Sequence, residues 1–193
     1  MTEAKRLLIT GASSGIGRHA ARLMEQEGHR LTLICRNHQR AAETLNWIGP
    51  TTRVLEADLA DLEQVDALCA TLLQEEQPID ALVLNAGLQY AGHRQPRWSR
   101  QGIELTLAVN HLAHQLMLMR LLPLLQQTDE PRVVITASEV HNPARGGGRV
   151  GRPAGLGDLA GLRSGAGSRM VDGSHRFDAD KAYKDSKLCN LLM

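Results

Sequence analysis

Residues 5–17 have the sequence KRLLITGASSGIG, and this stretch decides the fold that we predict for the chain. Its first six residues predict a short buried strand, which leads directly into a glycine-rich turn. Beyond the turn, Ala20, Ala21, Leu23 and Met24 have the spacing of an amphipathic helix that ends near Gly28. A glycine motif that binds a dinucleotide needs a strand before it and a helix after it, and this motif has both.

The glycine-rich turn has the chemistry of a pyrophosphate site. Glycine lets the backbone turn tightly and approach a ligand closely. The free N–H groups at the start of the following helix, together with the positive end of its dipole, attract anions. The alternative is a turn that only connects two elements, and the helix that follows favours the phosphate site. The predicted site residues in the turn are Gly11, Ser13, Ser14, Gly15, Ile16 and Gly17.

Apolar runs further along the chain alternate between strand and helix patterns. Four more strands are predicted at 31–35, 53–56, 79–84 and 133–137, and helices at 15–27, 38–48, 61–76, 102–126 and 179–192. This alternation predicts an α/β fold with a Rossmann-like, doubly wound parallel sheet in three layers, formed as one domain over residues 1–193. Ligands bind such sheets at the carboxyl ends of the strands, and the candidate site residues lie at or after those ends.

A second pattern lies near the end of the chain, where Tyr183 and Lys187 are four residues apart. On a helix these two positions share a face, so a phenol and an ammonium group lie side by side. A nearby positive charge favours the ionised form of the phenol, which helps a tyrosine to transfer protons near neutral pH. The alternative is a surface helix that carries a tyrosine and scattered charges, and the spacing alone does not exclude it.

The order of these motifs resembles the short-chain dehydrogenase/reductase family over essentially the whole chain. The series is Thr10 to Gly17, Asn85-Ala-Gly87, Asn110, Ser138 and Tyr183-x-x-x-Lys187. By this resemblance, the glycine turn holds the pyrophosphate of a cofactor, and Asn85, Ala86 and Gly87 form a turn beneath its adenosine. Asp58 and Leu59, at the end of the third strand, are expected to contact the adenine.

The same resemblance implies a catalytic group formed by Asn110, Ser138, Tyr183 and Lys187. Tyr183 is expected to donate a proton as hydride arrives, while Lys187 supports the phenol and binds the nicotinamide ribose. Ser138 would end a buried strand and hold the substrate oxygen or the tyrosine hydroxyl, and its alternative is a simple strand-end hydroxyl. Asn110 would bind a water linked to the lysine, and its alternative is a solvent-facing polar group on a helix.

Residues 138–192 resemble, more narrowly, the light-dependent protochlorophyllide reductases. The shared features are Gly157-Asp-Leu159, Met170-Val-Asp-Gly173, KAYKDSKLCN at 181–190 and a long gap of 45 residues from Ser138 to Tyr183. This resemblance implies reduction of a pigment C=C bond after light excites the pigment. The chain departs from the pattern near the fourth strand. There, Leu84 replaces a typical cysteine, and Gln89 a typical tyrosine, with Tyr90 one position later.

Two other functions fit the sequence. One is a carbonyl reductase or alcohol dehydrogenase that acts on an apolar substrate, such as a retinoid or a steroid-like ketone. The other is an inactive module that only binds NADPH. Family members normally continue beyond the Tyr-x-x-x-Lys helix with further strands and a substrate lid. The chain is therefore expected to be a fragment or a truncated product that lacks the usual last strands.

Arg36 follows the end of the second strand, where Cys35 stands in the region of the acidic residue that would bind a ribose 2′-hydroxyl. A guanidinium group suits a 2′-phosphate because it donates two hydrogen bonds in one plane. NADP(H) is therefore the predicted cofactor. The alternative is an exposed arginine at a strand end.

Composition limits the partners of the chain. A net charge of +1 over 193 residues argues against a nucleic-acid partner, which needs a concentrated basic face. Three cysteines have neither the spacing of a metal site nor an even count for disulfides, so we predict no metal and a reducing, cytoplasmic compartment. No signal peptide or integral membrane segment is expected. The predicted partners are a small-molecule substrate and, by resemblance, a second copy through the helices at 102–126 and 179–192.

Residues 141–176 differ from the rest of the chain. They contain ten glycines and six arginines but only two acidic residues, Asp158 and Asp172. This composition predicts a loop without regular core structure. It would be either a mobile surface loop or a cationic rim that guides an anionic substrate.

Overall fold

The computed structural model describes residues 3–49, 51–163 and 169–193, which form two compact units. Unit 1 consists of Met1–Leu59, Glu63–Ala86 and Leu116–Ile135, and unit 2 of Ala60–Leu62, Gly87–Gln115 and Thr136–Met193. Unit 1 contains the sheet, and unit 2 contains the helix with Tyr183 and Lys187. The assignment of one domain to residues 1–193 stays a prediction.

Unit 1 is built on a parallel sheet of five strands in the order β3-β2-β1-β4-β5. The strands are β1 (Arg6–Thr10), β2 (Arg30–Cys35), β3 (Arg53–Glu56), β4 (Ala81–Leu84) and β5 (Arg132–Ile135). From β1 the chain first adds β2 and β3 on one side, and it then crosses back to add β4 and β5 on the other side of β1. This is the doubly wound arrangement that the sequence predicts. The Rossmann-like fold class is therefore confirmed.

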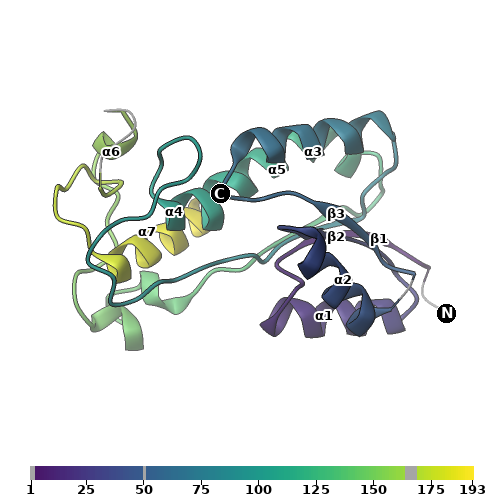
Figure 1. Cartoon of the computed structure of the whole chain (residues 1–193), viewed down its shortest axis with the longest axis horizontal. Helices are drawn as coiled ribbons and strands as arrows, with labels where there is room; N and C mark the ends of the chain where they lie inside the picture. The colour runs from purple at the N-terminus through teal and green to yellow at the C-terminus, as the bar shows by residue number, and fades with distance from the viewer. Residues whose placement is uncertain (1–2, 50, 164–168) are drawn as a thin grey trace. The chain divides into compact units, whose positions relative to one another are not determined.

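One face of the sheet is covered by α1 (Gly15–Gln26) and α2 (His38–Ile48), as Figure 1 shows. Alternate strand residues point to this face, so Leu7, Ile9, Leu31 and Leu33 form one buried cluster with the helices. Asn37 caps α2, because its side chain accepts a hydrogen bond from the Arg40 N–H. Few polar groups enter this layer, so burial of aliphatic side chains holds it together.

The other face of the sheet lies against α3 (Leu62–Gln74) and the unit 1 part of α5 (Ala113–Leu125), which run side by side in Figure 1. An ion pair of 2.9 Å between Arg120 and Asp66 joins the two helices. The strand residues that point to this face include Leu8, Leu82 and Leu84, which are almost fully buried. Helices on both faces give the predicted three layers.

The named elements of unit 2 are helices and helical turns joined by long loops. They are α4 (Leu105–Leu107), the π-helical turn η1 (Ala108–Leu112), the 3₁₀ turns η2 (Glu139–His141) and η3 (Gly146–Arg149), α6 (Ala160–Arg163) and α7 (Ala179–Leu192). The Asp178 side chain caps α7 by accepting a hydrogen bond from the Lys181 N–H. Helix α7 is buried along most of its length, so it forms the centre of this unit.

Two predictions about these elements are wrong in detail. The helix expected at 102–126 begins at Leu105, because the buried Glu104 side chain accepts hydrogen bonds from the first N–H groups of the helix. It is also interrupted by the π-helical turn η1. The strand expected at 133–137 ends at Ile135, and its Val133 and Val134 are exposed rather than buried. Strand β5 pairs only with β4 among the described residues, so it lies at an edge of the sheet.

Candidate functional site

The glycine turn of unit 1 packs directly on the segment that follows β4. A side chain at Gly11 would place its Cβ 2.6 Å from the Ala86 Cα, and one at Gly17 would lie 2.3 Å from the Asn85 Nδ2. Asn85 Nδ2 donates to the carbonyl oxygens of Thr10 and Gly11, at 3.3 Å each. The turn therefore needs glycine at these two positions for its own packing.

Gly15 differs from Gly11 and Gly17, because packing does not require a glycine at its position. Its φ is +56°, and no atom lies within 4 Å of where its Cβ would be. Ser14 occupies the N-cap of α1, but its side chain makes no capping hydrogen bond, and the first turn contains no acidic residue. Ser14, Gly15 and Ile16 are exposed. The helix start thus combines open space with uncapped N–H groups, which fits a pyrophosphate.

Three further predicted cofactor residues also lie in unit 1. Arg36 directly follows β2 and is exposed, and its guanidinium has no recorded partner among the described residues. Asp58 lies two residues after β3, and its main-chain N–H donates to Gln64 Oε1 at 3.0 Å. Leu59 is 9% exposed. These residues follow the carboxyl ends of β2 and β3, which are neighbours in the sheet.

Lys187 occupies a buried position on α7 in unit 2. Its side chain is only 2% exposed, and Nζ donates to the Thr136 carbonyl at 2.9 Å. Nζ also lies 5.6 Å from the centre of the Tyr183 ring, so the predicted pair of phenol and ammonium is formed. Burial lowers the pKa of Lys187 below its usual value. The alternative of a surface helix is wrong, since most of α7 is buried.

Asn110 lies in the π-helical turn and is fully buried, so the alternative of a solvent-facing amide is wrong. Its Oδ1 accepts from the Leu88 N–H at 2.7 Å, and its Nδ2 donates to the Leu88 carbonyl at 3.0 Å. Nδ2 is also within 3.1 Å of the Ser186 hydroxyl on α7. A Cβ at Gly87 would lie 3.5 Å from both Asn110 Oδ1 and Lys187 Nζ. Asn110, Gly87 and Lys187 therefore meet at one place.

Ser138 is half-buried and caps the short turn η2, where its Oγ accepts from the Val140 N–H at 3.5 Å. The expectation that it ends a buried strand is wrong, since β5 ends at Ile135 and is mostly exposed. Among the described residues, the recorded hydrogen bonds of Ser138 are local and include one that its carbonyl oxygen accepts from the Nδ1 of His141. Its catalytic role stays a prediction.

The described part of the segment 141–176 is held by α7 and by the core of unit 2. Lys184 on α7 donates to the carbonyl oxygens of Gly148, Val150 and Arg152, so it holds three points of the segment. Met170 and Val171 are buried in two apolar clusters of unit 2. Positions 164–168 lie outside the described residues. In the described remainder, regular structure is limited to the short elements η3 and α6, as the composition predicts, while Met170 and Val171 join the segment to the core of unit 2.

A buried ion-pair network on α7 escaped the sequence reasoning. Lys181 is paired with Asp185, one turn along the helix at 2.5 Å, and with Asp172 at 3.1 Å. Burial raises the pKa of Asp172, but hydrogen bonds from Ser174 and Lys181 outweigh it and lower the value to about 2. The i,i+4 spacing of Lys181 and Asp185 predicts that the two side chains pair on a helix. Such pairs usually lie on the surface, so the spacing did not predict that this pair is buried.

Two further buried side chains, one on α7 and one on α5, lie near the candidate catalytic group. Cys189 is a small buried thiol that packs with Leu107 and Val171, and burial raises its pKa to about 11. His114 is fully buried, with Nδ1 at 3.1 Å from the Asn110 carbonyl, and burial lowers its pKa to about 4. Neither thiol nor imidazole belongs to the candidate catalytic group.

A sequence model for the short chain dehydrogenase family matches residues 5–148. The chain belongs to this family. The match begins at the first strand, includes the glycine turn and Asn110, and extends ten residues beyond Ser138. The matched range therefore contains the glycine turn of unit 1 and the Asn110 region of unit 2.

Curated relatives of this short-chain dehydrogenase are protochlorophyllide reductases. The chain is 39% identical to the enzyme from Avena sativa, over 96% of its own length and 63% of the relative's. It is also 39% identical to the chloroplastic protochlorophyllide reductase A from Oryza sativa subsp. japonica, over 96% of its length and 51% of the relative's. The chain therefore spans between about half and two thirds of these proteins, and the narrower resemblance is confirmed.

Solved structures agree on the fold. An uncharacterised protein from Mycobacterium paratuberculosis has a TM-score of 0.74 at 26% identity, covering 97% of this chain and 59% of that one. A 3-ketoacyl-(acyl-carrier-protein) reductase from Brucella melitensis, solved with NADH, has a TM-score of 0.60 at 26% identity, covering 74% of this chain and 60% of that one. No helix among the described residues is long and apolar enough to cross a bilayer.

Proposed function

We propose that the chain is the cofactor-binding and proton-donating part of an NADPH-dependent short-chain dehydrogenase that reduces a C=C or C=O group. The single observation that carries this proposal is the pair of Tyr183 and buried Lys187 on α7. The first choice of substrate is a protochlorophyllide-like pigment that light excites. The relatives at 39% identity carry that name, and they support the choice.

The residues present in unit 1 fit a dinucleotide. The uncapped start of α1 and the open space at Gly15 suit the pyrophosphate, with the Ser13 and Ser14 hydroxyls beside it. The Arg36 guanidinium suits a 2′-phosphate, because it can donate two hydrogen bonds in one plane and has no recorded protein partner among the described residues. Asp58, Leu59, Asn85 and Ala86 are proposed to line the adenosine side, and Gly87, which follows Ala86 in the chain, belongs to unit 2.

In unit 2 we assign the proton transfer to the Tyr183 hydroxyl. Lys187 Nζ lies 5.6 Å from the centre of the Tyr183 ring, and two unit charges at about this separation attract each other by about 3 kcal/mol at an effective dielectric constant of about 20. The Lys187 ammonium therefore stabilises the negative charge that develops on the phenol as its proton leaves. The Thr136 carbonyl fixes this ammonium, and Asn110 fixes the neighbouring main chain through Leu88. When bound, NADPH supplies the hydride, and Ser138 is proposed to hold the substrate oxygen.

The first test measures nucleotide binding. Titration of the chain with NADPH and NADH, followed by nicotinamide fluorescence, is expected to show tighter binding of NADPH. Arg36→Ala should weaken NADPH binding at least about tenfold, the loss expected when a hydrogen bond to a charged group is removed, and leave NADH unchanged. Arg132→Ala removes an arginine at the amino end of β5 and is the matched control. Equal affinity for both nucleotides in the parent chain would contradict the NADPH assignment.

Turnover is measured on the same proteins. Protochlorophyllide in the presence of NADPH should be reduced in light and not in darkness, and Tyr183→Phe should lower the rate by at least about 100-fold while nucleotide binding is kept. Turnover of a retinoid or steroid-like ketone in darkness would indicate a carbonyl reductase instead. NADPH binding without turnover of either substrate would indicate an inactive binding module.

A cytoplasmic location remains a prediction. The described cysteines Cys35, Cys69 and Cys189 are free and buried, and these free thiols support a reducing compartment. Several plant relatives are chloroplastic proteins. Fractionation of cells that produce the chain would test the location.

A further inference from the structure

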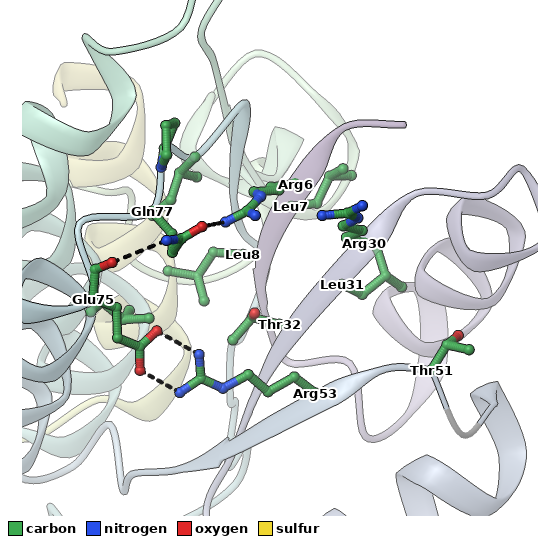
Figure 2. Close-up of a pocket in the computed structure, with 13 residues that line it drawn as sticks. Arg6, Leu7, Leu8, Arg30, Leu31, Thr32, Thr51, Arg53, Glu75 and Gln77 are labelled. Carbon is green, nitrogen blue, oxygen red and sulfur yellow. Dashed lines mark hydrogen bonds and ion pairs between the residues drawn. The ribbon is translucent and has the colours of Figure 1, made fainter. Parts of the chain in front are cut away.

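Unit 1 contains a hollow of about 420 Å³ at the opposite end of the sheet from the glycine turn. Figure 2 shows it at the start of β1, β2 and β3, next to the end of α3. In the register of the sheet, Leu8 pairs with Thr32, and Thr32 pairs with Arg53. These three side chains therefore point to one face. The volume lies within the range of about 300–1,000 Å³ that small-molecule sites occupy.

The floor of the hollow is apolar. It is formed by Leu8 from β1, Leu72 from α3 and Ile79 from the segment before β4. Each of these residues is at most 7% exposed. Thr32 adds a half-buried hydroxyl. A floor of this kind accepts a hydrocarbon body rather than a sugar or a nucleotide base.

The rim of the hollow is cationic. Arg6, Arg30 and Arg53 are the first residues of three neighbouring strands, and Glu75 is the one carboxylate among the lining residues. Glu75 is engaged by Arg53, whose Nη1 and Nη2 each donate to it at 2.6 Å. Arg6 donates to the neutral side chain of Gln77. The rim therefore has two positive charges that no lining carboxylate balances.

These two unbalanced charges lie on adjacent strands. Arg6 and Arg30 are register partners between β1 and β2, and like charges in this position destabilise a sheet. Asp80 accepts from the main-chain N–H of Arg6 at 2.7 Å rather than from its guanidinium. Arg30 has no recorded side-chain partner among the described residues. Both guanidinium groups are on the same rim in Figure 2.

We propose that this hollow binds an amphipathic carboxylate, with its head group between Arg6 and Arg30 and its hydrocarbon chain on Leu8, Leu72 and Ile79. The carboxylate relieves the repulsion between the two arginines, and the chain covers the apolar floor. The site is separate from the cofactor site, because the two ends of the five-residue strand β1 are roughly 13 Å apart at about 3.3 Å per residue. The proposal is independent of the function proposed for the chain.

The test uses decanoate as the probe, below its micelle concentration, and follows the amide signals of the ¹⁵N-labelled 193-residue chain. Decanoate should shift the signals of Leu8, Thr32, Leu72 and Ile79 in a saturable way. Arg30→Gln should weaken this binding at least about tenfold, the loss expected for one charge-assisted hydrogen bond. Thr32→Phe, which fills the hollow with a side chain that suits a strand, should abolish it.

Three controls decide whether the site is specific. Arg132→Gln neutralises the first residue of β5, which does not line the hollow, and should leave decanoate binding unchanged. Decanol and decyltrimethylammonium test the need for the carboxylate, and both should bind at least about tenfold more weakly. Binding of decanol that equals that of decanoate, or binding that survives Arg30→Gln in a chain with an unchanged amide spectrum, would overturn the proposal.

Discussion

Lys187 shows how a single residue prepares the proposed site. Its ammonium is buried and has one recorded hydrogen bond, to the Thr136 carbonyl. Since burial lowers its pKa in the folded chain, the unfolded chain binds this proton more tightly. The residue therefore opposes folding at neutral pH, and this cost disappears as the pH rises toward the usual lysine value. A charge retained at such a cost is what a group that stabilises a developing phenolate requires.

The glycines of the turn differ in how much each one contributes to the stability of the fold. Gly17→Ala should lower the free energy of unfolding by about 3 kcal/mol or more, because its Cβ would lie 2.3 Å from Asn85 Nδ2 and 2.4 Å from the Gly11 carbonyl oxygen. Gly15→Ala meets no atom and should cost only about 1 kcal/mol, from its left-handed backbone. Urea unfolding of both variants gives the two values. Equal losses would show that the packing on Asn85 is not what requires Gly17.

At the scale of elements, α7 uses its three described lysines for three purposes. Lys181 pairs with two carboxylates, Lys184 holds three carbonyl oxygens of the segment 146–152, and Lys187 faces Tyr183. Two of the lysines therefore fix the preceding segment to the helix, and only the third faces the tyrosine of the proposed proton transfer. The position of the Tyr183 helix within unit 2 depends on these anchors.

The Asp172 anchor predicts a pH dependence. Its folded pKa of about 2 lies below the ordinary 3.8, so it stabilises the chain above pH 4 by about 2 kcal/mol. As the pH falls through this window, the contribution is lost and should be roughly half as large at pH 3. Asp172→Asn should therefore destabilise the chain by about 2 kcal/mol at pH 7 and by about half of that at pH 3, as measured by urea unfolding.

Asp158→Asn is the matched control for this experiment. Asp158 belongs to the same segment and pairs with Arg163 at 3.4 Å, but both side chains are about 70% exposed. An exposed pair of this kind contributes at most about 1 kcal/mol. A loss at Asp158 as large as that at Asp172 would show that burial of the network is not the source of its stability.

At the scale of the whole chain, the features that could be predicted from the sequence are those set by neighbouring residues, such as the ends of helices and strands. The bounds of α2, β3 and α7 agree with their apolar spacing, because each has a clear beginning and end in the sequence. The structure of the segment 146–152 could not be predicted, because carbonyl oxygens bound by Lys184 leave no trace in the residue types of that segment. The hollow beneath Arg30 was also missed, since it depends on the register of three strands.

Self-association is the last prediction, and it concerns α5. Met119 and Leu122 lie three residues apart on this helix and are 66% and 45% exposed, so they form an apolar stripe on unit 1. Light scattering should give a mass near twice the 21.1 kDa of one chain, and the double variant Met119→Asp with Leu122→Asp should give the mass of one. Leu23→Asp on α1, where Leu23 is 61% exposed, is the control and should keep the larger mass. A parent chain of 21.1 kDa at all concentrations would contradict the homodimer, and a double variant that stays paired would show that another face joins the two copies.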